Sequence, residues 1–124
     1  MSALMKRILV IDDEPTVRDI CKRILSDSDL MVDTAPDGIT GQWMIEAAHY
    51  ELCLVDMKLP LMNGQEFFAW LKEKHPELAA KTIFMTGDIL EGDTQSFLDD
   101  LKRPYLLKPF TANELKALVT EVLK

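Results

Sequence analysis

The sequence is poor in cysteine and has no long apolar run, and each shortage excludes a class of protein. Cys21 and Cys53 are its only cysteines; both stand within apolar patterns and form no C-x-x-C pair. We therefore expect two buried thiols in a reducing compartment, without a disulfide or a metal bound to sulfur. No apolar run approaches the roughly 20 residues of a membrane-spanning helix, and the N-terminus has no signal-peptide core. The pattern is typical of a cytoplasmic protein.

Basic residues are also scarce relative to acidic ones. The 14 lysines and arginines against 21 aspartates and glutamates give a formal net charge of -7. Binding to nucleic acid or insertion into an anionic membrane requires clustered positive charge or long apolar runs, so we expect neither, and a protein or cationic partner instead. Repeats, linkers and low-complexity tracts are absent as well. We expect one domain over residues 1–124, with its core from about residue 6 to the last residue.

Five short apolar runs predict five strands, at 7–11, 30–35, 52–56, 81–85 and 104–107. The first and third runs do not alternate with polar residues, and each leads into carboxylates. Parallel strands that are covered on both faces have this pattern where they end at a functional edge. Helical patterns separate the five runs. The alternation predicts an α/β fold, in which a parallel sheet carries helices on both faces.

The helical patterns differ in clarity. Pro15 stands at a helix N1 position and opens an amphipathic pattern of about three turns. In the helix after Gly38, we expect one apolar face made of Ile39, Trp43, Met44 and Ala47. A third helix runs to a break at His75-Pro76, a weak one covers about 91–102, and the last one is centred on 115–122.

Four of the predicted strands deliver polar side chains to the same edge of the sheet. These are Asp12 and Asp13 after the first strand, Asp56 at the end of the third, Thr86 after the fourth, and Lys108 after the fifth. In an open α/β sheet, ligands bind outside the carboxyl ends of the strands. Each residue by itself has a structural explanation, such as a helix cap for Asp13 or a surface charge for Lys108. All of these explanations would have to hold at once, so we favour a functional site.

This set of residues predicts phosphoryl transfer. Neighbouring carboxylates disfavour one another's ionisation, and a hard divalent cation relieves that repulsion. Mg²⁺ binds through a few carboxylates and keeps several waters that phosphate oxygens can replace. We expect Asp56 to attack phosphorus in line and to become an aspartyl phosphate. Mg²⁺ and Lys108 would neutralise charge on the phosphoryl oxygens, and Thr86 would donate a hydrogen bond.

The order of these motifs resembles the receiver domain of two-component response regulators, over about residues 6–124. The matching features are Asp12-Asp13, Asp56 followed by Pro60 and Gly64, Thr86, and Lys108-Pro109. The resemblance implies a flavodoxin-like (βα)5 three-layer sandwich with strand order 2-1-3-4-5. It also implies that Asp56 accepts phosphate from the phosphohistidine of a histidine kinase or a histidine phosphotransfer protein. Beyond self-phosphorylation and autodephosphorylation at Asp56, we expect no conventional enzyme activity.

The resemblance further implies a role for each site residue. Asp13 and Asp56 would bind Mg²⁺ directly, and Asp12 would bind it through water. The backbone carbonyl of Lys58 would complete the protein ligands. Lys108 would contact the phosphoryl group, and its peptide bond to Pro109 is typically cis in such domains.

Thr86 and Tyr105 match the family's switch pair. On phosphorylation the Thr86 hydroxyl would move toward a phosphoryl oxygen, and Tyr105 would turn inward into the vacated space. The readout would be the surface formed by the helix over about 91–102, the fifth strand and the last helix, which is also our candidate homodimer face. Lys58 and Asp88 occupy positions that tune autodephosphorylation in this family, and we expect a slow to moderate rate.

Two other functions share the fold class. A flavin-binding flavodoxin needs a first loop rich in Ser, Thr or Gly to hold a phosphate, whereas the acidic loop from Asp12 to Pro15 would repel one. A Mg²⁺-dependent phosphohydrolase with an aspartyl-phosphate intermediate stays open as the enzymatic alternative, but it usually carries an acid where this chain has Lys58. Between contexts, we favour the excised C-terminal receiver of a hybrid histidine kinase over a free-standing single-domain response regulator.

Overall fold

The structure, a computed structural model, describes residues 5–26, 29–87 and 92–124, without the side chains of 92–95 and 101. Its strands are β1 (Lys6–Ile11), β2 (Leu30–Ala35), β3 (Leu52–Asp56), β4 (Thr82–Thr86) and β5 (Tyr105–Leu107). Its helices are α1 (Pro15–Ser26), α2 (Gly38–Ala47), α3 (Gly64–Lys74), α4 (Pro76–Ala79), α5 (Gly92–Leu101) and α6 (Ala112–Leu123). Each predicted strand is present within one residue of its expected bounds.

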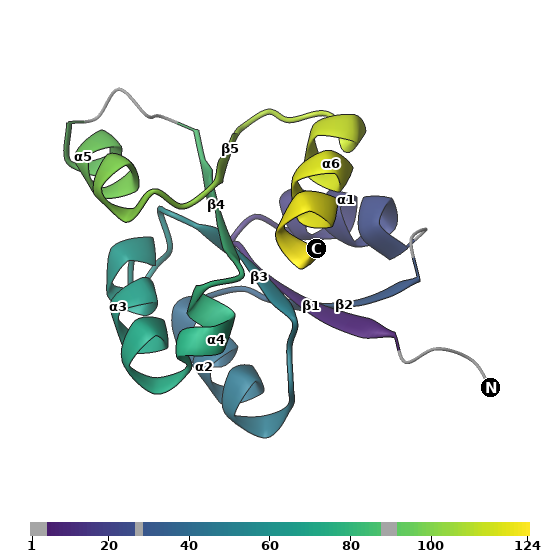
Figure 1. The fold of residues 1–124 in the computed structure, drawn as a ribbon, viewed down its shortest axis with the longest axis horizontal. Coiled ribbons are helices and arrows are strands. Elements are labelled where there is room, and N and C mark those ends of the chain that lie inside the picture. Colours follow the sequence, from purple (N-terminus) through teal and green to yellow (C-terminus); the bar gives the residue numbers. More distant parts are fainter. Residues whose placement is uncertain (1–4, 27–28, 88–91) are drawn as a thin grey trace.

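The five strands form one parallel sheet in the order β2-β1-β3-β4-β5. This order confirms the flavodoxin-like topology that the resemblance implies. Helices α1 and α6 lie together on one side of the sheet, and α2, α3 and α4 lie on the other (Figure 1). Within the described residues, no helix combines the length and the apolar character needed to cross a bilayer.

Alternate residues of the central strands point into two cores. Leu9 and Ile11 of β1 pack with Phe67 of α3 in the core beneath α2, α3 and α4. Ile8 of β1 packs with Leu115 of α6 in the core beneath α1 and α6. These strand residues are fully buried. Both faces of the sheet are therefore covered, as the unbroken apolar runs predict.

Both cysteines are buried and free, as expected from the sequence. Burial raises the pKa of the Cys21 thiol to about 12 and also raises the pKa of the Cys53 thiol. Thiols held in this protonated form are poor nucleophiles and poor metal ligands. Cys21 and Cys53 are therefore core residues.

The predicted apolar face of α2 is not the side that packs on the sheet. Ile39 and Trp43 are 41% and 75% exposed. The buried side is formed by Gly38, Gly41 and Ile45. At Gly41 the helix approaches β1 so closely that a Cβ atom would lie 2.6 Å from Cδ1 of Ile11. A hydrophobic pattern does not identify a contact that depends on the absence of a side chain.

The break predicted at His75-Pro76 is confirmed, but a further short helix follows it. His75 is the C-cap of α3, and Pro76 is the first residue of α4. Proline is favourable at a helix N1 position because its missing N–H would have no partner there. The same proline therefore ends one helix and begins the next.

Candidate functional site

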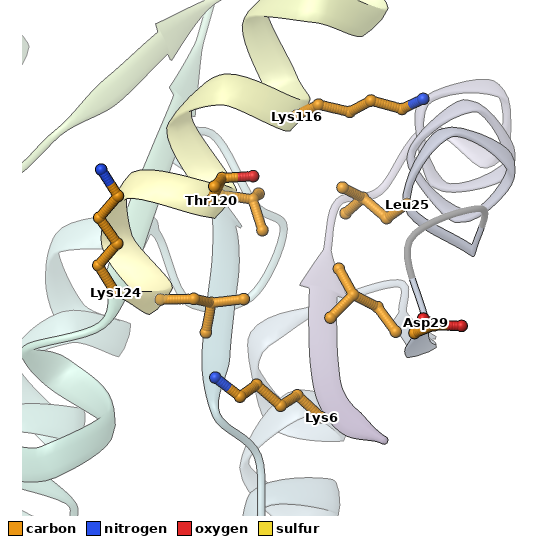
Figure 2. Close-up of a pocket in the computed structure, with 9 residues that line it drawn as sticks. Lys6, Leu25, Asp29, Lys116, Thr120 and Lys124 are labelled. Carbon is orange, nitrogen blue, oxygen red and sulfur yellow. The ribbon is translucent and has the colours of Figure 1, made fainter. Parts of the chain in front are cut away.

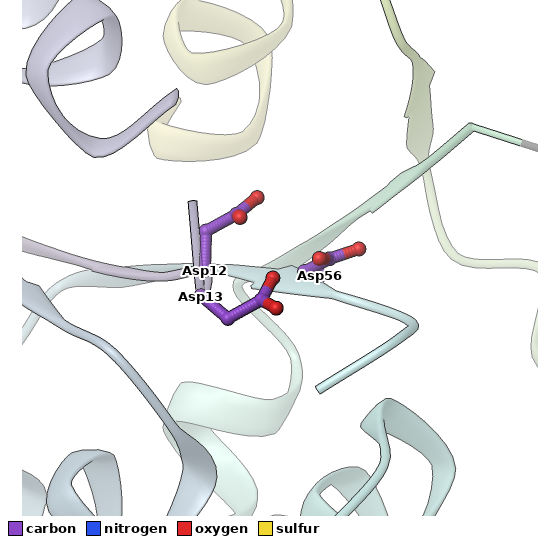
Figure 3. A group of neighbouring side chains, drawn as sticks. All are labelled: Asp12, Asp13 and Asp56. Atoms are coloured by element: carbon purple, nitrogen blue, oxygen red, sulfur yellow. The ribbon is translucent and has the colours of Figure 1, made fainter. Parts of the chain in front are cut away.

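Three carboxylates meet at the carboxyl edge of the sheet. Asp12 and Asp13 follow β1, and Asp56 is the last residue of the neighbouring strand β3. One oxygen from each carboxylate lies within 4.8 Å of those of the other two, and this is the only such group of three among the described residues. Figure 3 shows the three side chains around one space. Asp12 and Asp56 are buried and Asp13 is exposed, so the site is open on the Asp13 side.

Backbone hydrogen bonds hold the two buried carboxylates in place. The N–H of Asp12 donates to the carbonyl of Ala35 over 3.1 Å, which extends the pairing of β1 with β2 by one residue. Asp12 Oδ1 accepts from the N–H of Glu14 at 2.9 Å, and Asp56 Oδ1 accepts from the N–H of Lys58 at 3.3 Å. The strand ends and the first turns after them therefore fix where each carboxylate lies.

Lys108 brings a positive charge to this cluster. Its Nζ donates to Asp12 Oδ2 at 2.7 Å, and it lies 3.4 Å from both Asp56 Oδ2 and Glu14 Oε1. The backbone N–H of Lys108 donates to the carbonyl of Thr86 at 2.8 Å. The Lys108-Pro109 peptide bond is cis, which confirms the expectation from the resemblance. Lys108 therefore contacts the carboxylates from a loop that is tied to the end of β4.

Burial and charge shift the ionisation of both partners. Burial, together with the charge of Asp12, raises the pKa of Asp56 to about 6, although Lys108 and the Lys58 N–H act in the opposite direction. Burial by itself would lower the pKa of Lys108. The hydrogen bond to Asp12 and the charges of Asp56 and Asp12 outweigh burial and raise that pKa. Lys108 is thus held as a cation, whereas burial and the charge of Asp12 disfavour the ionised form of Asp56.

This donor set suits a hard divalent cation. All three candidate ligands are carboxylates, with no nitrogen or sulfur among them, and oxygen ligands are what Mg²⁺ prefers. A cation at this place would favour the ionised form of Asp56, whose pKa is raised by burial and by repulsion from Asp12. The exposed Asp13 leaves a side from which a metal ion can enter with its waters. The chemistry of the three residues therefore fits Mg²⁺.

Comparison with known proteins identifies the family. The family model described as "Response regulator receiver domain" matches residues 8–120. The chain belongs to this family. Receiver domains are the phosphorylated modules of two-component signalling, and they bind Mg²⁺ at an acidic pocket. This family assignment does not favour the phosphohydrolase alternative.

Solved structures agree with the assignment. A receiver domain protein from Methanospirillum hungatei is 30% identical, has a TM-score of 0.87, and is matched over 97% of this chain and 94% of that one. The response regulator TrrA from Thermotoga maritima, solved in complex with Mg²⁺ and BeF, is 31% identical with a TM-score of 0.83. That match covers 96% of this chain and 100% of TrrA. The fold of this receiver domain is therefore that of its family.

Curated relatives are longer proteins in most cases. The sensor histidine kinase TmoS from Ectopseudomonas mendocina is 29% identical over 94% of this chain, which corresponds to 12% of TmoS. The transcriptional regulatory protein DltR from Streptococcus agalactiae is 33% identical over 91% of this chain, which corresponds to half of DltR. The chain thus spans half or less of the length of these two relatives.

The two predicted switch residues of the receiver domain lie in adjacent strands. Thr86 is buried at the end of β4, and Tyr105 opens β5 and is 39% exposed. β4 and β5 are paired so that Thr86 is opposite Leu107, two residues beyond Tyr105. Tyr105 thus has a solvent-exposed position in this structure. Lys58 and Asp88 are the pair predicted to tune autodephosphorylation. Lys58 is exposed beside the site, and Asp88 lies outside the described residues.

Two residues near the carboxylates were not identified from the sequence. Glu14 Oε1 lies 3.4 Å from Nζ of Lys108, which makes it a third acid near that cation. Arg18 Nη1 donates to the backbone carbonyl of Asp12 over 2.8 Å. Arg18 lies four residues, or one helical turn, after Glu14. An arginine at this spacing after an acidic loop could have indicated its contact with the loop.

The receiver domain has a second hollow far from the carboxylates. A groove of about 420 Å³ lies between α1 and α6, near the amino ends of the strands. Figure 2 shows Lys6, Lys116 and Lys124 around it, with Leu25 pointing inward. Asp29 is the acid among its lining residues. Because a single acid lines it, this groove cannot supply the carboxylate cluster that the predicted chemistry requires.

Proposed function

We propose that residues 1–124 form one receiver domain in which Asp56 accepts a phosphoryl group from a phosphohistidine. The observation that carries this proposal is the convergence of Asp12, Asp13 and Asp56 with Lys108 at the carboxyl edge of the sheet. Asp56 is the member of this group that ends a central strand. The donor would be a histidine kinase or a histidine phosphotransfer protein, the two classes of partner with which receiver domains interact.

The transfer itself is a displacement at phosphorus. An ionised Asp56 oxygen forms a bond to phosphorus while the bond between phosphorus and the donor's imidazole nitrogen breaks, and the nitrogen keeps the electron pair. Lys108 lies 3.4 Å from Asp56 Oδ2, so it is close enough to contact an oxygen of the group that arrives. Its raised pKa keeps it positively charged throughout.

We assign the metal ligands as the family pattern implies. Asp13 and Asp56 would hold Mg²⁺ directly, Asp12 would hold it through water, and the backbone carbonyl of Lys58 would complete the protein ligands. When bound, Mg²⁺ neutralises charge on the phosphoryl oxygens during transfer. Support comes from the three carboxylates, whose ligand atoms lie within 4.8 Å of one another.

Phosphorylation would then bias a switch. The Thr86 hydroxyl moves to a phosphoryl oxygen, and Tyr105 turns inward from its exposed position. The changed surface comprises α5, β5 and α6, and it is our candidate face for a homodimer of the phosphorylated protein. Tyr105 and Leu107 are 39% and 48% exposed on this face, which supports a role in protein contacts.

The lifetime of the phosphoryl group would depend on Lys58 and Asp88. This pair would partly shield the aspartyl phosphate from water and give a slow to moderate rate of autodephosphorylation. The test compares phosphate release from the wild type and from a Lys58→Ala, Asp88→Ala double variant. Equal rates would reject this role.

The phosphodonor would dock beside Lys108, because its histidine must reach Asp56. A groove of about 300 Å³ opens there between the start of α1 and the loop before α6. This donor groove is lined by Glu14, Val17, Ile20, Lys108, Pro109 and Phe110. Ile20 is 43% exposed, so an apolar side chain is available to a partner next to the site.

We favour the C-terminal receiver of a hybrid histidine kinase over a free-standing response regulator, and the similarity to the sensor kinase TmoS supports this preference. The net charge of -7 argues against direct binding to nucleic acid. The two free thiols suit the reducing cytoplasm.

Phosphorylation with a small donor tests the central claim. The protein is incubated with acetyl phosphate, with and without Mg²⁺, and its intact mass is followed for the wild type and for Asp56→Asn. We expect a gain of one phosphoryl group that requires Mg²⁺ and is absent from the variant. No gain in a folded wild type that binds Mg²⁺ and releases no phosphate would reject the proposal.

A further inference from the structure

Helix α2 exposes an apolar stripe to solvent. Ile39, Trp43 and Ala47 follow one another at intervals of four residues, so they lie on one face of the helix. Ile39 is 41% exposed, Trp43 is 75% exposed, and Ala47 is also exposed. Three successive turns therefore present an apolar side chain on the same side. We call these three residues the α2 stripe.

The α2 stripe lies away from the side of α2 that packs on the sheet. Gly38, Gly41 and Ile45 are buried on that inner side. The helix is therefore apolar on two sides. A helix with this pattern usually has both sides packed against other protein surfaces. In this structure, the α2 stripe is the side without a cover. Tryptophan is enriched at the centres of protein interfaces, and here it is the central member of the stripe.

We propose that the α2 stripe packs against the α2 stripe of a second copy of this chain, with the two helices antiparallel. A two-fold axis near Trp43 would then place Ile39 against the partner's Ala47. The large Ile39 thus meets a small side chain, and Trp43 meets the partner's Trp43. The alternation of large and small side chains makes the stripe self-complementary, which an interface between identical surfaces requires.

The distribution of charge favours a second copy as the occupant. Each protein molecule carries a net charge of -7, so two copies repel each other unless they meet at a face with little charge. Glu46 is the single charged residue of α2. It lies 3.5 Å from Nε2 of His75, which offers it a partner within its own chain. In contrast, α1, α3, α5 and α6 each carry three or more charged residues.

The proposed interface is separate from the phosphotransfer surfaces. α2 lies on the opposite side of the sheet from α1 and α6 (Figure 1), and the donor groove lies by α1. The interface also does not involve β5 or α6. We therefore expect the α2 dimer to form before phosphorylation and to leave the donor groove open. One helical stripe is smaller than a standard interface, so the dimer should be weak and appear at high protein concentration.

Sedimentation velocity and tryptophan emission over a range of protein concentrations test the proposal on the unphosphorylated chain. We expect a monomer–dimer equilibrium that Trp43→Ala weakens about tenfold or more. Ala47→Glu, which adds an acid at one end of the α2 stripe, should weaken the dimer as well. Leu107→Ser alters the α5, β5 and α6 face proposed for the phosphorylated dimer, so it should have no effect on the unphosphorylated protein and separates the two interfaces. In a Trp70→Phe background, the emission of Trp43 should shift to the blue as concentration rises.

Cysteine cross-linking tests the antiparallel arrangement. Because Cys21 and Cys53 are buried, introduced surface thiols would dominate mild oxidation. A mixture of Ile39→Cys and Ala47→Cys chains should form disulfide-linked dimers faster than either variant alone. A wild type that is monomeric into the millimolar range would overturn the proposal. A dimer that tolerates both Trp43→Ala and Ala47→Glu, or that Leu107→Ser disrupts, would overturn it as well.

Discussion

Asp56 occupies its buried position at a cost in stability. Its pKa rises from an ordinary value of 3.8 to about 6, first because of burial and then because of Asp12. Between these two pH values the folded protein holds a proton that the unfolded chain has released. The contribution of Asp56 to stability therefore falls as the pH rises through this range.

Replacing Asp56 by asparagine should thus stabilise the metal-free protein at neutral pH and above. We expect Asp56→Asn to be more stable than the wild type by about 1–2 kcal/mol above the raised pKa, and by much less below pH 3.8. Urea denaturation in the presence of a chelator, at a pH below 3.8 and at a pH above the raised pKa, measures the difference in the free energy of unfolding. Mg²⁺ should stabilise the wild type and not the variant. A difference that does not change with pH would contradict the assigned cause.

Gly64 fixes the turn that follows Asp56. A Cβ atom on Gly64 would lie 2.8 Å from Cα of Met57 and 2.9 Å from the carbonyl oxygen of Asp56. Both contacts are with backbone, which cannot move without displacing the carboxylate. A Cβ atom on Gly87 would meet nothing within 4 Å.

The two glycines therefore make a matched pair for substitution. We expect Gly64→Ala to lower the free energy of unfolding by about 1–3 kcal/mol, because the backbone around Met57 must shift. It should also slow phosphorylation by acetyl phosphate. Gly87→Ala should change stability by less than about 0.5 kcal/mol. Thermal denaturation and intact mass measure the two effects, and similar losses in both variants would argue against the close approach at Gly64.

At the scale of elements, capping boxes begin two of the helices. In α6, the Thr111 side chain accepts from the N–H of Glu114, and the Glu114 side chain accepts from the N–H of Thr111. Asn63 and Glu66 form the same pair at the start of α3. These bonds satisfy N–H groups that have no partner within the helix. They also determine where the loops after β3 and β5 turn into the next helix.

Thr111→Ala should therefore destabilise the protein although Thr111 is exposed. We expect a loss of about 1 kcal/mol in the free energy of unfolding. Thr120 is an exposed threonine inside the same helix, and Thr120→Ala should be neutral or slightly stabilising because alanine has the higher helix propensity. Urea denaturation of both variants checks this. Equal effects would mean that helix propensity, and not the cap, governs position 111.

The sequence predicted best those elements whose burial is complete. β3 is buried at every position, so its apolar run has a single interpretation. α2 was less predictable because Gly38 and Gly41, which have no side chain, form most of its inner side. α4 was missed because Pro76 marks both the end of α3 and the start of the next helix. In both cases the local pattern is ambiguous until the neighbouring element is in place.

In the candidate site, too, some features were predictable from the sequence and others depend on neighbouring elements. The convergence of Asp12, Asp56 and Lys108 was predictable, because parallel strands bring their carboxyl ends to one edge. The shorter distance from Lys108 to Asp12 than to Asp56 was not predictable, because it depends on the path of the loop before α6. The contact of Arg18 with the Asp12 carbonyl depends on the first turn of α1. Such distances are set by tertiary packing and not by spacing in the sequence.

At the scale of the whole molecule, the proposed role of Asp56 implies that access to it would distinguish two kinds of phosphodonor. A small donor needs only the open carboxylate cluster, whereas a protein donor must also contact the surface around it. The donor groove is lined by Lys108 and by the exposed apolar side chain of Ile20. A substitution at Ile20 should therefore affect one kind of donor and not the other.

We expect Ile20→Ser to lower the rate of transfer from a phosphohistidine protein by about tenfold, because an apolar contact of the donor groove with the partner is lost. Its rate with acetyl phosphate should equal that of the wild type. Met31→Ser is the control, because Met31 is exposed to the same extent, 43%, on the edge strand β2. Phosphoprotein gels with a phosphorylated donor measure the transfer. Equal losses with both donors would mean that Ile20 acts on the carboxylate cluster itself, and full activity with both would place the donor elsewhere.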